Sequence, residues 1–250
     1  MFSLTVAAVL SLVPSILGQS VYLAGDSTMA ATGDGSGWGA FLGDYLTLPV
    51  INNAVAGTSA RSYTALGLFT TLIDEVESGD FVIIEFGHND GSAGAIDNGD
   101  EDAVGDAYNL TMTVTEANGT TEIIHSFNFY IVNAVVALQA KGAISIVSSQ
   151  TPDNIWDGDV LAAAPRFVAY AQEVPGNTST TYIDHFDYVA QAYKLLGRLK
   201  WTLCTQLIIC IPRQSRKHRR KAFVRGVLCS SSTLKNFVNS AGEAVPNGCL

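Results

Sequence analysis

The stretch "VYLAGDSTMA", residues 21–30, joins a short apolar run to an aspartate and a serine. An apolar run of this length that stops at turn residues is typical of a buried strand. Four more such runs follow, at residues 49–55, 81–87, 143–149 and 180–186. Helical patterns separate them, and this alternation predicts a parallel sheet with helices on both faces. We therefore predict an α/β fold, a flavodoxin-like three-layer sandwich with a five-stranded parallel sheet, in a single domain.

Five segments between or after these runs show apolar residues at helical spacing. They are residues 37–46, 62–76, 127–142, 164–174 and 186–197. Gly142 and Gly197 end two of these segments and are expected to stop a helix. The loop from Gly91 to about Ile123 is acidic and rich in glycine, and its "DNGDEDAVGD" does not fit the spacing of a calcium loop. We expect a solvated insertion there, without a metal.

The composition limits the class of protein. The chain has 250 residues, of which 48% are hydrophobic, so one domain can bury a sizeable core. Its formal charge of -9 argues against a nucleic-acid partner, because neutralising phosphates requires a basic face. Beyond the first twenty residues, no apolar run reaches the length of a membrane span. We expect a soluble monomer with no nucleic-acid or membrane partner.

The chain begins with "MFSLTVAAVLSLVPSILGQS", residues 1–20, which is apolar, uncharged and ends in small residues. This pattern predicts a secretory signal peptide over residues 1–18, although its basic n-region is missing apart from the α-amino group. A buried first helix is the alternative. If the leader is cleaved near Gly18, the mature domain spans residues 19–250 and is extracellular.

Two further features agree with export. Acceptor triplets for N-glycosylation begin at Asn109, Asn118 and Asn177. The chain also has four cysteines, which are Cys204, Cys210, Cys229 and Cys249. Four are too few for a disulfide scaffold, so we expect one or two disulfides on an ordinary core.

Candidate catalytic residues follow three of the predicted strands, at the edge where open parallel sheets collect their functional groups. Ser27 would expose an oxygen nucleophile among outward-pointing N–H groups, although a serine that opens a helix is more often a cap. Gly57 would let the backbone approach a ligand, or form an ordinary turn. The Asn89 amide would donate to an oxyanion, or close an Asx turn. Together the three predict an acyl-transfer site.

These three positions also carry a resemblance. "GDS", the glycine of "AVAG" and "GHND" resemble blocks I, II and III of the SGNH (GDSL-type) hydrolases. Longer stretches, "VYLAGDSTMA", "NNAVAGTSARSY", "VIIEFGHNDG" and "SSQTP", are similar to the fungal rhamnogalacturonan acetylesterases, between Val21 and Gly197. The resemblance implies the SGNH hydrolase fold with Ser27 as nucleophile. It implies an oxyanion hole made by the N–H of Ser27, the N–H of Gly57 and the side chain of Asn89.

The same resemblance implies a reaction. Members of that family remove acetyl groups from pectic rhamnogalacturonan, so the implied partner is an acetylated plant cell-wall polysaccharide, and no cofactor or metal is implied. The ending "VLCSSSTLKNF...NGCL" resembles the family's closing disulfide loop, which would pair Cys229 with Cys249. The loop at 91–123 lacks the cysteine pair associated with the family.

One family block is missing, namely D-H-T-H-T-S-P, whose first aspartate and second histidine activate the serine. A serine hydroxyl needs such a base, oriented by a carboxylate. "YIDHFDYV" offers Asp184 and His185, but it matches the family's fifth strand, and adjacent strand residues point to opposite faces. His218 lies in the right region, but no acidic residue occurs between Asp187 and Glu243. We expect neither histidine to be the base.

The block is expected where the chain carries "RLKWTLCTQLIICIPRQSRKHRRK", residues 198–221. Nine of the 14 lysines and arginines fall between Arg198 and Arg225. In a shifted reading frame, each new codon takes the last base of one residue's codon and the first two bases of the next. From the codon that spans Thr205 and Gln206 onward, these new codons are compatible with the sequence P-I-D-H-L-H-T-S-P. We therefore predict that residues 198–221 are frame-shifted, through a sequencing indel or a misplaced intron boundary.

Two other interpretations of the basic run stay open. It could be a basic patch that binds an anionic polysaccharide. It could also be a solvated tail, although "WTLCTQLIICI" would then form an exposed apolar patch. We predict a serine esterase of SGNH type that removes acetyl groups from rhamnogalacturonan and is impaired in the chain as written. The alternative is a secreted carbohydrate-binding pseudoenzyme.

Overall fold

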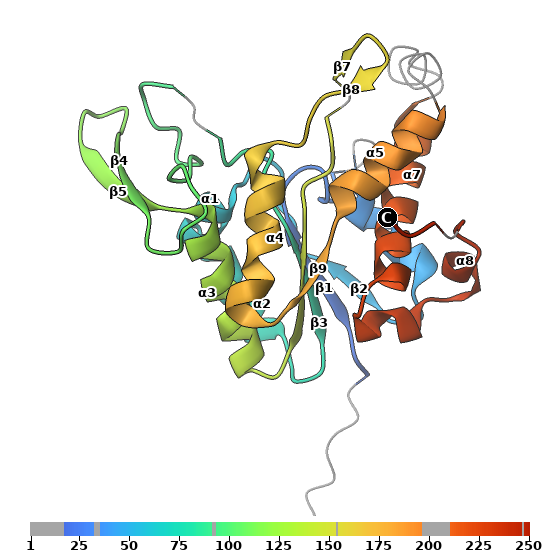
Figure 1. The fold of residues 1–250 in the computed structure, drawn as a ribbon. Helices are drawn as coiled ribbons and strands as arrows, with labels where there is room; N and C mark the ends of the chain where they lie inside the picture. Colours follow the sequence, from blue (N-terminus) through green and yellow to red (C-terminus); the bar gives the residue numbers. More distant parts are fainter. Residues whose placement is uncertain (1–17, 33–35, 92–93, 154, 197–210, 247) are drawn as a thin grey trace, which may run out of the picture.

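The computed structural model describes residues 18–32, 36–91, 94–153, 155–196, 211–246 and 248–250, with the backbone alone at 196 and 211–217. Its main sheet has five parallel strands in the order β2-β1-β3-β6-β9 (Figure 1). They are β1 (Val21–Gly25), β2 (Val50–Asn52), β3 (Phe81–Glu85), β6 (Ile144–Ser148) and β9 (Thr181–Ile183). Each lies within a predicted run, so the five-stranded parallel sheet is confirmed.

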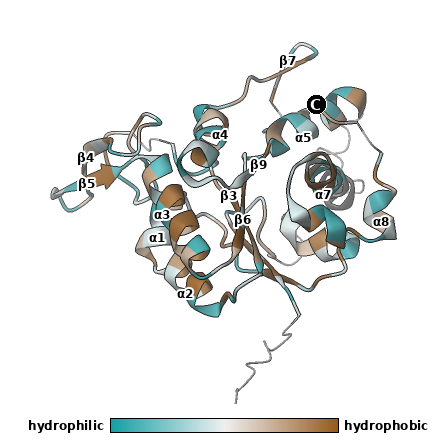
Figure 2. Cartoon of the chain, turned by 60° about the horizontal axis from the view of Figure 1, so that its bottom comes forward, coloured by the Kyte–Doolittle hydropathy of each residue, from teal (hydrophilic) through white to brown (hydrophobic). Residues whose placement is uncertain are grey.

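Helices cover both faces of this sheet, which confirms the three-layer architecture. One face carries α1 (Ala60–Ala65), α2 (Leu68–Glu75), α3 (Phe127–Ala140) and α4 (Arg166–Thr178). The other side carries η2 (Trp38–Tyr45), α5 (His185–Leu196), α7 (Ile211–Cys229), η3 (Thr233–Phe237) and α8 (Ser240–Glu243). Alternate residues of β1 point to opposite cores, with Tyr22 in one and Leu23 in the other. Figure 2 shows the hydrophobic central strands between the two helical layers.

Two predicted elements differ from the structure. The helical pattern at 62–76 is two helices, α1 and α2, because Gly67 between them has a φ of 71°, which breaks the helix. The run at 180–186 is a strand only as far as Ile183, and His185 already opens α5. Gly142 follows α3 with a φ of 82°, as expected of a helix stop, whereas Gly197 lies outside the described residues.

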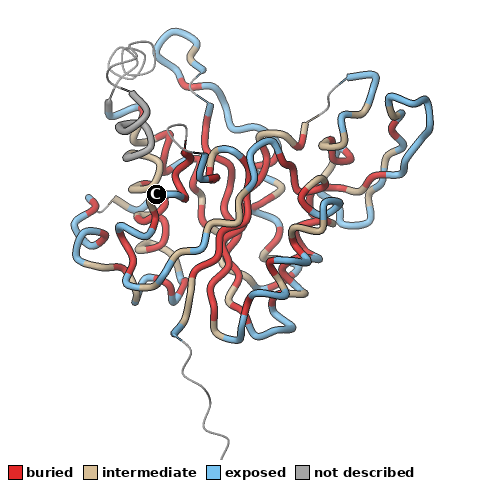
Figure 3. The backbone as a smooth tube through the Cα atoms, turned by 180° about the vertical axis from the view of Figure 1, so that it is seen from behind, coloured by how far each residue is buried: buried red, intermediate tan, exposed pale blue. Residues whose placement is uncertain are grey.

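The expectation of a solvated insertion is wrong in part. Strands β4 (Thr111–Thr115) and β5 (Thr121–His125) pair as an antiparallel hairpin whose surface is mostly exposed (Figure 3). The base of the insertion is buried, however, and Ala103, Val114 and Ile124 form a small core of their own. The structure also contains a short hairpin of β7 (Trp156–Asp157) and β8 (Val160–Leu161).

The structure bears on several of the remaining predictions. Cys229 and Cys249 form a disulfide, as the resemblance implied. The three acceptor asparagines are all exposed, so the fold permits glycosylation, which stays a prediction. Of the helices that the structure describes, none combines the length and the apolar character that a bilayer crossing requires. The predicted signal peptide falls in the undescribed N-terminal segment and also stays a prediction.

Candidate active site

Ser27 lies in the turn that follows strand β1, between β2 and β3 in the sheet, and it is exposed. The preceding Asp26 is buried, and its Oδ1 accepts hydrogen bonds from the backbone N–H and the hydroxyl of Thr28, both at 2.8 Å. Residues 27–29 form a turn and no helix begins at Ser27, so the cap interpretation does not apply. The Asp26 carboxylate therefore shapes a turn that presents the Ser27 side chain to solvent.

The structure brings the loops of Gly57 and Asn89 together beside this turn. Strands β2 and β3 flank β1, so the loops that follow them meet at the same carboxyl edge. Gly57 is exposed with a φ of 84°, a conformation that favours glycine. The Asn89 amide donates from Nδ2 to the carbonyl of Thr58 at 2.9 Å. This hydrogen bond links the two loops whose N–H groups are the predicted oxyanion donors.

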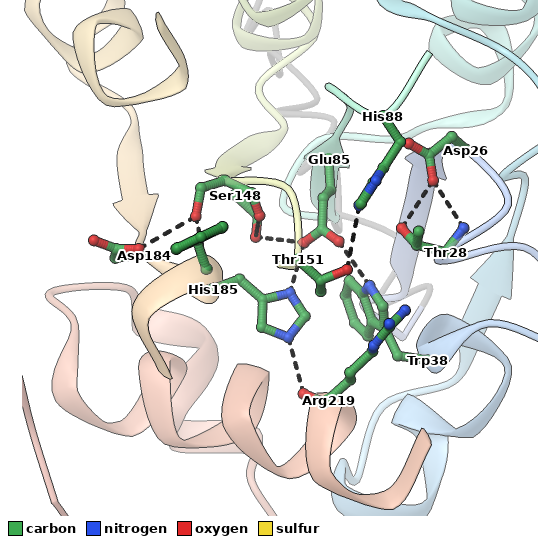
Figure 4. A network of polar contacts seen from close by, with 12 residues as sticks. Asp26, Thr28, Trp38, Glu85, His88, Ser148, Thr151, Asp184, His185 and Arg219 are labelled. Carbon is green, nitrogen blue, oxygen red and sulfur yellow. Dashed lines mark hydrogen bonds and ion pairs between the residues drawn. The ribbon is translucent and has the colours of Figure 1, made fainter. Parts of the chain in front are cut away.

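His88 lies at the same edge, near Asp26 and Thr151 (Figure 4). Its Nδ1 is 3.4 Å from a carboxylate oxygen of Asp153, and its Nε2 is 3.4 Å from the hydroxyl of Thr151. Burial lowers the pKa of His88, but the hydrogen bond with Asp153 and the charge of Asp26 outweigh it, so the pKa is raised overall. In its protonated form, His88 offsets the negative charge of Asp26, the residue directly before the nucleophile.

Below this edge, Glu85 at the end of β3 accepts hydrogen bonds from three buried side chains (Figure 4). The donors are Trp38 Nε1 at 2.8 Å, the Ser148 hydroxyl at 2.6 Å and His185 Nδ1 at 2.7 Å. The other ring nitrogen of His185, Nε2, lies 2.9 Å from the carbonyl of Arg219 on α7. Both ring nitrogens of His185 are therefore engaged, and in its protonated form His185 donates from both of them and makes a buried ion pair with Glu85.

This network explains why His185 is not the catalytic base. A base needs a ring nitrogen free to take the serine proton, and both nitrogens of His185 are engaged in a fully buried site. His185 opens α5 and does not lie in a strand, so the expectation that it and Asp184 point to opposite faces of a strand is wrong. Asp184 instead caps the start of that helix, because its Oδ1 accepts from the N–H of Asp187 at 3.0 Å. The same oxygen lies 3.4 Å from the Ser149 hydroxyl.

Asp90, next to Asn89, forms a buried carboxyl pair with Asp102 of the insertion. Asp90 Oδ1 accepts from the N–H of Ala60 at 2.8 Å. Within the described part of the chain, Asp90 Oδ2 and both oxygens of Asp102 have no donor, and a proton shared between the two carboxyl groups would satisfy one oxygen of each. Burial, with the nearby charge of Asp26, raises the pKa of Asp90 to about 7 despite the hydrogen bond from Ala60.

We expect this pair to make stability fall as the pH rises from about 4 to above 7. A carboxyl group with a raised native pKa stabilises the fold while it is protonated, and that contribution is lost as the pH passes through the native value. Asp90→Asn keeps an acceptor for Ala60 and supplies a donor to Asp102. Urea unfolding at pH 5 and pH 8 should therefore show a smaller loss of stability for Asp90→Asn than for the parent. Equal losses would show that the pair does not titrate as described.

The chain is similar in sequence to known proteins. A family model for GDSL-like lipases and acylhydrolases matches residues 21–120. The chain is 43% identical over 189 residues to the rhamnogalacturonan acetylesterase of Emericella nidulans, a match that covers 75% of this chain and 76% of the relative. The chain belongs to the GDSL (SGNH) hydrolase family. Its class is therefore that of the carboxylic ester hydrolases, and the resemblance drawn from blocks I to III is confirmed.

Solved structures of GDSL hydrolases share the fold. The YXIM protein of Bacillus subtilis superposes with a TM-score of 0.65 at 18% identity, over 84% of this chain and 56% of that one. The acetylxylan esterase Axe2 of Geobacillus stearothermophilus superposes with a TM-score of 0.59 at 13% identity, over 84% of this chain and 94% of that one. At these identities the likeness shows the three-layer α/β fold alone.

The predicted loss of the family's D-H block, which would hold the catalytic base, stays a prediction. The run at 198–221, where that block is expected, lies mostly in the undescribed segment 197–210 and in the start of α7. His125, at the end of β5, stacks on Phe129 with ring centroids 3.8 Å apart. His218, on α7, lines a cavity between α5 and α7.

Proposed function

We propose that the protein is a serine acetylesterase whose substrate is acetylated rhamnogalacturonan. The observation that carries this is the meeting of Ser27, Gly57 and Asn89 on three adjacent loops, in a chain 43% identical to a relative named rhamnogalacturonan acetylesterase. Ser27 attacks the acetyl carbonyl, and the N–H of Gly57 and the amide of Asn89 hold the oxyanion. Collapse of the tetrahedral intermediate releases the sugar hydroxyl, and water then releases acetate from the serine.

The base for this reaction belongs to the acid/base block, which we propose is displaced by a shifted frame at residues 198–221. Support comes from the side chains beyond the run. From Ala222 onward, α7 places Phe223, Val224 and Val227 fully in the core beneath the sheet. The family-like sequence thus resumes within α7, in the part of that helix whose side chains pack in the core. The chain as written therefore has the nucleophile and the oxyanion donors but not the base.

The alternative, a carbohydrate-binding pseudoenzyme, would use the basic run as its binding surface. Two of its arginines have intramolecular partners instead. Arg219 donates from Nε to the Tyr193 hydroxyl at 2.9 Å, and Arg220 lies over the rings of Phe41 and Tyr45. We therefore favour the esterase. Binding of acetylated pectin without turnover, lost on Lys/Arg substitution between 213 and 221, would support the pseudoenzyme.

Substrate preference tests the proposed function. In a chain that carries the acid/base block, acetate release should be at least about tenfold faster from acetylated rhamnogalacturonan than from acetylated xylan, each measured as kcat/KM. Ser27→Ala in the same chain should lower both rates by about 10³-fold or more, because no other group can form the acyl-enzyme. Faster release from xylan would assign a different substrate, and release unaffected by Ser27→Ala would refute the mechanism.

We further propose that the protein is secreted, with residues 1–18 removed as a signal peptide. The first described segment, which starts at Gly18, leads directly into β1, so a chain that begins at Gln19 keeps the whole sheet. The exposure of Asn109, Asn118 and Asn177 suits glycosylation during export. Mass spectrometry of the secreted protein before and after glycosidase treatment measures both the new N-terminus and the glycans.

A further inference from the structure

Arg61 is the only lysine or arginine among the first 140 residues of the chain. It is the second residue of α1, four positions after Gly57, and its side chain is 6% exposed. A buried cation this close to the oxyanion loop needs partners to offset its loss of hydration. The catalytic steps described above do not use it.

All the partners of the Arg61 guanidinium lie in the 91–125 insertion. Nη1 donates to Asp97 Oδ1 at 2.9 Å and to the carbonyl of Glu101 at 3.1 Å. Nη2 donates to Asp97 Oδ2 at 2.8 Å and to the carboxylate of Glu122. The pair with Asp97 is bidentate, the geometry that only arginine among the cationic side chains can provide. Arg61 therefore fixes three separate points of the insertion to the start of α1.

Further hydrogen bonds connect the start of α1 with the insertion, by way of Asp90. The N–H of Ala60 donates to Asp90, and the N–H of Asp102 donates to the carbonyl of Asp90 at 3.1 Å. Asn89, next to Asp90, donates to the carbonyl of Thr58. The two loops that carry the oxyanion donors are thus bonded to each other and to the insertion, through residues 58–61 of one loop and residues 89–90 of the other.

We propose that Arg61 is a positioning residue, and that the 91–125 insertion it holds is a brace that keeps the Gly57 N–H and the Asn89 amide aimed at the oxyanion. The assignment to catalysis rests on the proposed function, whereas the brace itself does not. Oxyanion donors work because they are held in place before charge develops, and a displacement of about 1 Å can cost on the order of 10²-fold in rate. Arg61 acts through these loops and does not touch the reacting atoms.

Hydrogen exchange in the full chain as written tests the brace. Arg61→Gln removes the charge and one bidentate pair, so the amides of Ala60 and Asp102 should exchange at least about tenfold faster, together with those of the β4–β5 hairpin. The matched control is Arg225→Gln, since Arg225 lies on α7, in the other helical layer, where it donates to Gln191 Oε1 at 2.8 Å. Unchanged exchange at Ala60 in Arg61→Gln would overturn the proposal.

Kinetics in the chain carrying the acid/base block test the catalytic part. With 4-nitrophenyl acetate, Arg61→Gln should lower kcat by about 10- to 100-fold with less than about a threefold change in KM, because the oxyanion forms only in the transition state. Arg61→Lys should recover part of the loss, since it restores the charge without the fork. An unchanged kcat in folded Arg61→Gln would refute the positioning role. A block-carrying parent that releases no acetate would refute the proposed function, and the exchange result would still decide the brace.

Discussion

A chain in which Leu207–Arg213 is replaced by Asp-His-Leu-His-Thr-Ser-Pro should release acetate from acetylated rhamnogalacturonan at least about 10³ times faster than the chain as written. The oxyanion donors at Gly57 and Asn89 are in place, but the Ser27 hydroxyl remains a weak nucleophile without a base. Adding the base and its orienting carboxylate supplies the step that is missing. The measurement is acetate release per mole of folded protein.

The matched control carries the same seven residues with the second histidine of the block replaced by alanine. It has the same length and nearly the same composition, so a rate gain that depends on the histidine is a gain in acid/base catalysis and not in folding. The account requires this control to be as slow as the chain as written. A chain as written that turns over as fast as the replaced chain would show that the base lies elsewhere.

Glu85→Ala should destabilise the fold by about 3–5 kcal/mol, the cost of leaving a buried ionic partner unpaired. The substitution removes the acceptor of Trp38, Ser148 and His185 at once, in a site where the Glu85 and His185 side chains are fully buried. It also breaks the connection that runs from β3 through His185 to the Arg219 carbonyl of α7. Urea unfolding at pH 7 measures the change in the free energy of unfolding.

Glu173→Ala is the control for this change, because Glu173 is an exposed residue of α4 and its loss removes the same number of atoms from the surface. It should alter the free energy of unfolding by less than about 0.5 kcal/mol. Glu85→Gln should lie between the two, since the amide oxygen still accepts one hydrogen bond but carries no charge. A loss below about 1 kcal/mol in Glu85→Ala would show that the network does not hold the layers together.

The strands were predictable because each of them lies in an apolar run bounded by turn residues. β1 and β3 are buried along their whole length, so their sequences read as continuous hydrophobic segments. The break between α1 and α2 was harder to predict, because the apolar spacing continues across Gly67 and only its positive φ interrupts the helix. The insertion was misjudged because some of its acidic residues are not solvated there. The Asp97 side chain is a buried partner of Arg61, 36 residues away, and Asp102 is buried beside Asp90.

Local chemistry allowed the prediction of the three catalytic candidates, since each lies in the loop that follows a strand. The supporting residues depend on contacts between distant segments. Glu85 and His185 are 100 residues apart, and Arg61 and Glu122 are 61 apart. The sequence nonetheless contained one sign of the buried network around Glu85. Glu85 is a single charge inside an apolar run, and such a residue is buried only with a partner.

Sequencing of the messenger RNA, as cDNA, across the codons for Gly197 to Arg225 tests whether residues 198–221 are frame-shifted. We expect the message to read through a D-H-x-H-T-S-P block in this interval, so that the translated protein has a complete Ser27 site. A message that encodes residues 198–221 as printed would contradict the account, because the base would then be absent from the protein itself.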